Sequence, residues 1–150
     1  MIGDLIFISA EYGPGAGVLR WDGSKLTDLW MSDEALTNHY ATSVYHEGYL
    51  YGFHGRQEFN PSFRAVELRT GKVRWSEDRF RAGSVTLAGN RLLILRETGE
   101  MILAAASPDA FRPIARAQIL PPTLRAYPAL ADGFLYVRNE NTLVCLDLRK

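Results

Sequence analysis

Three histidines, His39, His46 and His54, lie within 16 residues of one another and are the first candidates for chemistry in this sequence. Imidazole is a common metal ligand, so the cluster suggests a metal site. Spacings of 7 and 8 residues match no compact ligand motif, and His46-Glu47 lacks the second histidine of a His-Glu-x-x-His helix. We expect His46 to precede a turn at Gly48. His39 and His54 are expected to bond loop backbone, with a ligand site shared by these two as the alternative.

The stretch Gly13-Pro14-Gly15-Ala16-Gly17 could be mistaken for a phosphate-binding loop, because it is glycine-rich and follows a predicted strand. Phosphate binding by such a loop requires a helix directly after it, whose N-terminal amide groups bind the anion. Residues 18–21 instead predict a strand, which leads to a turn. We therefore interpret the stretch as a flexible loop between strands.

Acid–base catalysis would require two carboxylates that converge in one pocket. The acidic residues fall mostly in predicted turns, where a carboxylate ordinarily caps backbone amides; examples are Asp22, Glu47, Asp109 and Asp132. No pair stands out, so we assign no catalytic residue.

The longest insert between predicted strands, residues 54–63, is the better candidate for a functional surface. Loops on a rigid scaffold are where binding residues concentrate. We predict a binding surface formed by Arg56, Phe59 and Asn60, joined by His39 and His54.

Composition excludes several classes of partner. The 17 Lys and Arg residues balance the 17 Asp and Glu residues, so no net charge attracts nucleic acid or an anionic membrane. The longest apolar run, residues 101–106, is far shorter than the roughly 20 residues of a membrane span. A single cysteine, Cys145, excludes an intrachain disulfide, and its position between Val144 and Leu146 predicts a small buried residue.

A glycine-containing turn recurs along the chain at nearly constant spacing. The turn glycines are Gly3, Gly48, Gly89 and Gly133, separated by 45, 41 and 44 residues. Trp30 and Trp75 are also 45 residues apart, each at the end of a predicted strand. A repeat of about 40 to 45 residues with four short strands is typical of the blades of a β-propeller.

The second repeat contains all four strands of the predicted unit. They cover residues 42–46, 49–53, 64–68 and 72–75, with glycine turns at Gly48 and Gly71. This pattern predicts an up-and-down meander. The full set of predicted blade units covers residues 1–31, 40–77, 82–119 and 126–150 of a single segment, 1–150.

Two predicted strand segments, residues 92–95 and 135–137, are apolar on both faces. A sheet with one solvent-exposed face would alternate apolar and polar residues, so we expect each sheet to be covered twice. A β-sandwich is the structural alternative, but it does not predict the regular spacing of glycine and tryptophan. The sequence therefore predicts an all-β fold, a partial β-propeller of about three and a half four-stranded antiparallel blades.

Residues 65–75 resemble the tryptophan-docking pattern of the PQQ-like (pyrroloquinoline-quinone-like) repeat propellers, Ala-x-Asp-x-x-x-Gly-x-x-x-Trp. Ala65, Gly71 and Trp75 match the pattern, and Glu67 replaces its aspartate. Residues 144–149 repeat its first half. The resemblance implies that Trp30 and Trp75 dock between blades, supported by the turn glycines Gly48, Gly71, Gly89 and Gly133. In the third unit Ala115 falls near the tryptophan position, so that docking contact is expected to be lost.

The PQQ-like family includes quinoprotein dehydrogenases and the propeller lipoprotein of outer-membrane assembly. A dehydrogenase would be expected to show a vicinal cysteine pair, calcium-binding carboxylates and a catalytic aspartate, and this chain lacks such a constellation. We predict a non-catalytic interaction or scaffold module without cofactor or metal, which binds a protein or ligand through loops on the blade faces. Part of a quinoprotein-like oxidoreductase that uses pyrroloquinoline quinone is the alternative. The resemblance implies a periplasmic or otherwise exported protein.

The repeat length also bears on completeness. At about 43 residues a blade, 150 residues make about three and a half blades, while closed propellers usually have about 4 to 8. The first unit lacks an innermost strand, and the fourth lacks its outermost strand, which leaves an open edge at residues 142–148. We expect either the C-terminal part of a longer propeller or a half-ring that associates with a second copy through its open blade edges.

Overall fold

The computed structural model describes residues 1–149, and these fold into four β-sheets joined by turns and linkers. The first sheet contains β1 (Leu5–Ala10), β2 (Gly15–Trp21) and β3 (Leu26–Ser32). The second contains β4 (Val44–His46), β5 (Tyr49–His54), β6 (Ser62–Glu67) and β7 (Val73–Glu77). The third contains β8 (Gly83–Ala88), β9 (Arg91–Arg96), β10 (Glu100–Ala105) and β11 (Arg112–Gln118). The fourth contains β12 (Ala129–Ala131), β13 (Phe134–Arg138) and β14 (Leu143–Asp147).

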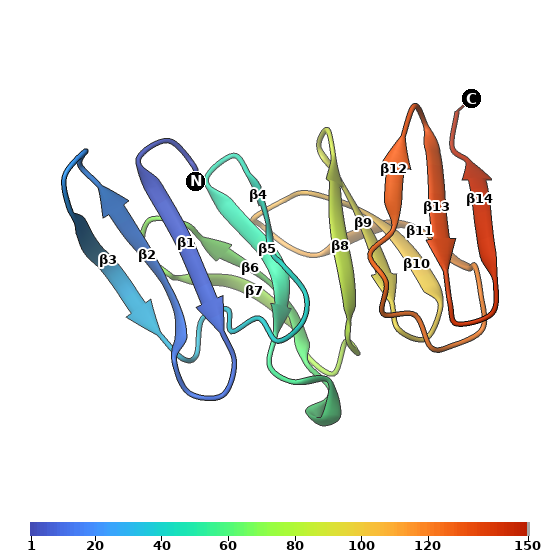
Figure 1. Cartoon of the computed structure of the whole chain (residues 1–150), viewed down its shortest axis with the longest axis horizontal. Coiled ribbons are helices and arrows are strands. Elements are labelled where there is room, and N and C mark those ends of the chain that lie inside the picture. The colour runs from blue at the N-terminus through green and yellow to red at the C-terminus, as the bar shows by residue number, and fades with distance from the viewer. Residues whose placement is uncertain (150) are drawn as a thin grey trace.

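Each sheet is an antiparallel meander, and the four sheets follow one another in chain order (Figure 1). One short 3-10 helix, η1 (Gln57–Phe59), follows β5. The predicted all-β, partial β-propeller is confirmed. Among residues 1–149, no helix is long and apolar enough to cross a membrane.

Apolar side chains fill the space between each pair of neighbouring sheets, in three separate clusters. The cluster between the first and second sheets includes Leu5, Val18, Leu36, Leu50, Val66 and Leu68. The cluster between the second and third includes Tyr51, Phe53, Phe63, Phe80, Leu92, Ile94 and Ile102. The cluster between the third and fourth includes Leu95, Leu120, Leu124, Leu135 and Val137. The two inner sheets are therefore packed against a neighbouring sheet on both faces.

The first three sheets share a register shift between their last two strands. The residues paired immediately before the shift are Val18 with Trp30, Ala65 with Trp75, and Leu103 with Ala115. In each sheet the next pair skips one residue of the last strand, which is the pattern of a β-bulge. The bulge gives the two tryptophans equivalent positions. It also assigns Ala115 to the position that tryptophan holds in the other two sheets.

Both tryptophans at this position reach the next sheet. The indole N–H of Trp30 donates a hydrogen bond to the carbonyl of Leu68 at 2.8 Å, and that of Trp75 donates to the carbonyl of Ser107 at 2.9 Å. Each acceptor lies just after the third strand of the following sheet. The exposed Ala115 has no side chain that could make this contact.

The indole of Trp30 packs directly against Gly71. Its φ of +73° is in the left-handed region, and a Cβ added there would lie 2.8 Å from two ring atoms of Trp30. Gly48, in the turn between β4 and β5, also has a positive φ of +92°, but open space surrounds it. Gly71 is therefore constrained by backbone and by packing, and Gly48 by backbone alone.

Two expectations at the end of the chain are wrong. Cys145 is exposed rather than buried, and Tyr136 is 40% exposed although its strand was expected to be covered on both faces. Both side chains lie on the face of the fourth sheet that points away from the third, because Val144 and Leu146 pack inward. Within residues 1–149, no further sheet covers that face.

Replacing Trp75 by alanine should lower the free energy of unfolding by about 3 to 5 kcal/mol, because it removes a large side chain from the interface between two sheets. Trp75→Phe should cost less, since it keeps most of the ring contacts and loses the hydrogen bond to Ser107. Urea denaturation would measure both. The control is Ile114→Ala in β11, where the side chain is exposed and the change should be small. Equal stabilities for Trp75→Ala and the parent would contradict the docking role.

Gly71→Ala should destabilise the protein more than Gly48→Ala. Both substitutions put a Cβ on a backbone with positive φ, but only the one at Gly71 also meets the indole of Trp30. Overpacking of this kind typically costs about 1 to 3 kcal/mol, which is the expected difference between the variants. Denaturation midpoints measured side by side would show it, and equal midpoints would mean that the indole moves aside freely.

Candidate functional site

Three loops meet at one end of the first two sheets. They are the turn after β1, which carries Tyr12, the linker before β4, which carries His39, and the insert after β5, which carries Arg56 to Asn60. The helix η1 in this insert projects beyond the ends of the strands (Figure 1). Asn60 ends the helix in the left-handed conformation, φ 54°, which asparagine tolerates better than most residues. This end of the molecule therefore presents side chains on a compact loop structure.

Arg56 contacts two exposed aromatic rings. Its guanidinium carbon lies 5.1 Å from the ring centroid of Tyr12 and 4.6 Å from that of Phe59. The two aromatic residues are 67% and 71% exposed. A cation over an aromatic ring is attracted by the quadrupole of the ring, so Arg56 restrains both rings without burying them.

His39 connects the loops to one another. Its Nδ1 bonds the side-chain oxygen of Gln57, and its Nε2 lies 2.9 Å from the hydroxyl of Tyr12. Because the amide oxygen of Gln57 can only accept, Nδ1 of His39 is the donor in the first of these contacts. We refer to Tyr12, His39, Arg56, Gln57 and Phe59 as the loop-tip cluster.

His54 has a different role from His39. Its Nδ1 accepts a hydrogen bond from the backbone N–H of Thr37 at 3.1 Å and lies 3.0 Å from the hydroxyl of the same residue. Burial, and secondarily the positive charge of Arg64, lower the pKa of His54 to about 4. A neutral imidazole is what these contacts require, so His54 anchors the linker between the first two sheets.

Other polar contacts fix the same linker. The buried Asn38 donates from its side-chain amide to the carbonyl of Phe53 at 2.9 Å, and its backbone N–H donates to the hydroxyl of Ser9 at 2.7 Å. Arg64 donates from Nη1 to the carbonyls of Glu34 and Ala35. The loop-tip cluster therefore stands on a linker that is tied to both adjacent sheets.

The predicted binding residues divide between two shallow depressions. His54, Arg56, Phe59 and Asn60 line one of about 280 Å³, together with Asp78 and Arg79. His39 lines a neighbouring one of about 300 Å³ with Phe7, Ser9, Asn38, Tyr40 and Thr42. Among residues 1–149, no group of three or more His, Cys, Asp or Glu side chains is arranged to hold a metal ion.

Sequence reasoning missed Tyr12 and Gln57. The loop that carries Tyr12 was interpreted only as a flexible connection, although a large aromatic beside Gly13 and Pro14 is itself a signal for an exposed contact residue. Its contact with His39 joins residues 27 positions apart, which no local pattern reveals.

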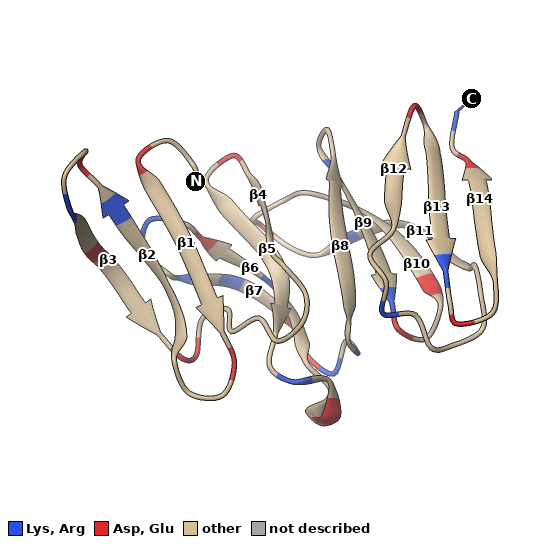
Figure 2. Ribbon diagram, viewed as in Figure 1, with Lys and Arg blue, Asp and Glu red and all other residues tan. Residues whose placement is uncertain are grey.

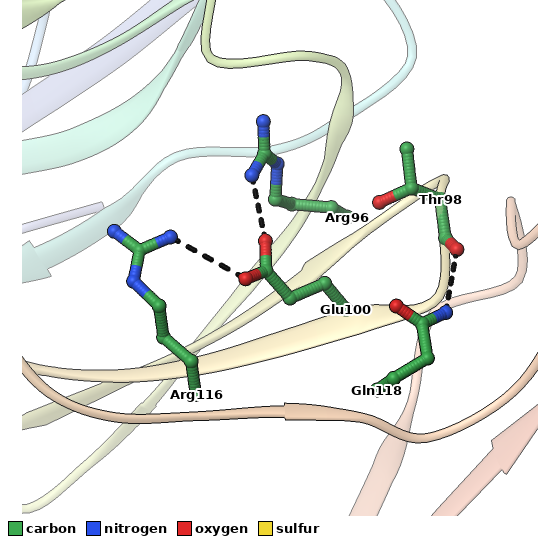
Figure 3. A network of polar contacts seen from close by, with 5 residues as sticks. All are labelled: Arg96, Thr98, Glu100, Arg116 and Gln118. Carbon is green, nitrogen blue, oxygen red and sulfur yellow. Dashed lines mark hydrogen bonds and ion pairs between the residues drawn. The ribbon is translucent and has the colours of Figure 1, made fainter.

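A second polar cluster lies in the third sheet (Figure 3). Glu100 accepts from Nη1 of Arg96 at 2.6 Å and from Nη1 of Arg116 at 3.4 Å, while Gln118 donates to the carbonyl of Thr98 at 2.8 Å. Partial burial raises the pKa of Glu100, but the two arginines outweigh it and hold that pKa below its usual value. A carboxylate paired on both oxygens is a structural group that joins three strands, and a poor proton acceptor.

Charge does not single out a binding face. Figure 2 shows basic and acidic residues distributed over strands and turns of all four sheets. The loop-tip cluster is therefore distinguished by its exposed aromatic rings.

Acidification should destabilise the protein through His54. Its pKa is about 4 in the folded protein and about 6.5 in an unfolded chain, so between these values only the unfolded state binds the proton. The free energy of unfolding should therefore fall as the pH is lowered from about 6.5 towards about 4. His54→Asn keeps an acceptor near Thr37 but does not titrate, and should reduce this pH dependence. Urea denaturation at several pH values would test this prediction. The control variant is His46→Asn, at the end of β4. Parallel curves of unfolding free energy against pH for His54→Asn and the parent would refute the prediction.

Solved structures that resemble this fold include BamB from Moraxella catarrhalis, which matches with a TM-score of 0.64 and 14% sequence identity, over 95% of this chain and 45% of that one. The computationally designed Ika8 protein matches with a TM-score of 0.61 and 11% identity, over 95% of this chain and 42% of that one. No family model and no curated protein sequence matches. The chain spans less than half the length of either protein. At these identities the likeness shows the fold alone, and that fold is of the β-propeller type.

Proposed function

We propose that this chain is a non-catalytic interaction module of the PQQ-like β-propeller type, and that it binds a protein partner through the loop-tip cluster. The observation that carries the proposal is the pair of exposed rings, Tyr12 and Phe59, held in place by one guanidinium. Tyrosine, phenylalanine and arginine are enriched where proteins bind one another. A surface already restrained before binding loses less entropy on association.

The PQQ-like assignment is supported by the geometry around Trp30 and Trp75. Each indole donates across an inter-sheet gap, and Gly71 leaves room for the first of them. These are the contacts that the motif in residues 65–75 implies. The likeness to BamB adds support for the fold.

A photo-cross-linking amino acid at position 59 tests the proposal in cells that naturally contain the protein. Phe59 projects from η1, so the probe should capture a discrete protein adduct. The same probe at position 114 of β11, where Ile114 is also exposed, is the matched control and should not capture that protein.

Binding to the captured protein, once purified, should then weaken at least about tenfold in Phe59→Ala, as expected for an aromatic that carries much of the binding energy. The melting temperature should stay unchanged because the ring is exposed. Unchanged affinity would refute the role of the cluster. A saturable absorbance change on titration with pyrroloquinoline quinone and calcium would contradict the non-catalytic proposal.

A further inference from the structure

The outer face of the fourth sheet carries residues at the same positions as those that form a buried inter-sheet contact in the second sheet. In the second sheet, Tyr51 pairs with Ala65, and both are completely buried because the third sheet covers them. In the fourth sheet, Tyr136 pairs with Cys145, and both are exposed. Each tyrosine lies three residues after its turn glycine, Gly48 or Gly133, so the two pairs are equivalent.

Two backbone hydrogen bonds support this equivalence. Leu68 donates to the carbonyl of Gly48 at 2.9 Å, and Leu148 donates to the carbonyl of Gly133 at 2.8 Å. We call the side of each sheet that points toward the next sheet in the chain its forward face, and the other side its rear face. The forward face of the fourth sheet thus repeats, uncovered, a pattern that is buried in the second.

The rear face of the first sheet has the complementary construction. In the second and third sheets, the first residue after the bulge on the third strand is Val66 or Ala104. Each pairs with a residue of the second strand, Leu50 or Leu92, and both pairs are buried on the rear face. The equivalent pair in the first sheet is Ile6 with Leu19. Ile6 and Leu19 are only half-buried, because no sheet precedes the first one within residues 1–149.

Further apolar side chains extend this rear face. Ile8, which pairs with Gly17, is 42% exposed, and Met31, which also pairs with Gly17, is 49% exposed. Trp21, two residues after Leu19, is 39% exposed on the same side. Within residues 1–149, the row of sheets therefore presents one uncovered forward face and one uncovered rear face, and both have the residue types of the three internal contacts.

We propose that a second copy of this chain covers both faces. The forward face of each fourth sheet packs on the rear face of the first sheet of the other copy, which forms two identical contacts and closes a ring of eight sheets. A contact between different faces closes into a ring when the rotation per copy fits. The chain spans 42% and 45% of the length of the two similar structures, so two copies correspond in length to 84% and 90% of them, which supports a ring made of two copies. This assembly does not depend on the loop-tip cluster or on its partner.

Sedimentation of the purified chain tests the assembly. The mass of one chain is 16.8 kDa, so the parent should sediment as a closed dimer of about twice that mass and not as a longer polymer. Tyr136→Asp on the forward face and Ile8→Asp on the rear face should each give monomers, because each change damages both contacts of the ring. Ile114→Asp, on the exposed strand β11, is the matched control and should remain dimeric.

Mixing the two variants tests the forward-to-rear geometry. Tyr136→Asp keeps an intact rear face and Ile8→Asp an intact forward face, so together they can form one undamaged contact. The mixture should therefore yield a heterodimer that neither variant forms with itself. If instead one of these variants alone stayed dimeric, two like faces would be in contact, and the proposal would be wrong.

Cys145, the only cysteine of the chain, provides an independent readout. It lies on the forward face, so a maleimide should label it slowly in the parent and rapidly in Ile8→Asp, whose substitution is on a different sheet. Equal labelling rates would overturn the proposal. So would a monodisperse parent of 16.8 kDa, or a native polypeptide of about twice this length that is itself a monomer, in which the remainder of the chain would cover both faces.

Discussion

The packing of the first three sheets depends on one contact made twice, the hydrogen bond from a tryptophan indole to a backbone carbonyl of the following sheet. A buried carbonyl without a donor is costly, so the contact fixes both the distance and the orientation of neighbouring sheets. The bulge directs Trp30 and Trp75 toward their acceptors, and Gly71 leaves space for the first ring. Turn, bulge and indole thus form one structural unit at the first two inter-sheet contacts.

The three inter-sheet contacts are not equally anchored. The first two combine a docked tryptophan with an apolar residue of the linker between the two sheets, Leu36 at the first contact and Phe80 at the second. The third has Ala115 in place of the tryptophan, and its cluster depends on Leu120 and Leu124 from the linker. The fourth sheet therefore lacks the orienting indole hydrogen bond that the second and third sheets receive.

The fold could be predicted from local patterns, because each sheet is a meander whose turns are encoded nearby. Glu47 and Gly48 both have positive φ, which is the signature of a tight hairpin turn. The face that a strand residue occupies is equally local, and Cys145 does alternate with its inward-facing neighbours Val144 and Leu146. Whether that face is covered is decided by another sheet, which a local pattern cannot report. For the same reason the sequence indicated Arg56 and Phe59 but not the contact of Arg56 with the distant Tyr12.

The surfaces used for binding and for assembly lie in different directions. The loop-tip cluster lies beyond the ends of β1 and β5, whereas the uncovered faces lie at the two ends of the row of sheets (Figure 1). In a ring closed by a second copy, the two-fold axis would run along the strands, so both clusters would be on the same side. A partner with two matching sites would then bind both at once, and the second contact would form at the high effective concentration set by the first. The open faces and the aromatic loops would in this way contribute to one function, since assembly would multiply the strength of a modest binding surface.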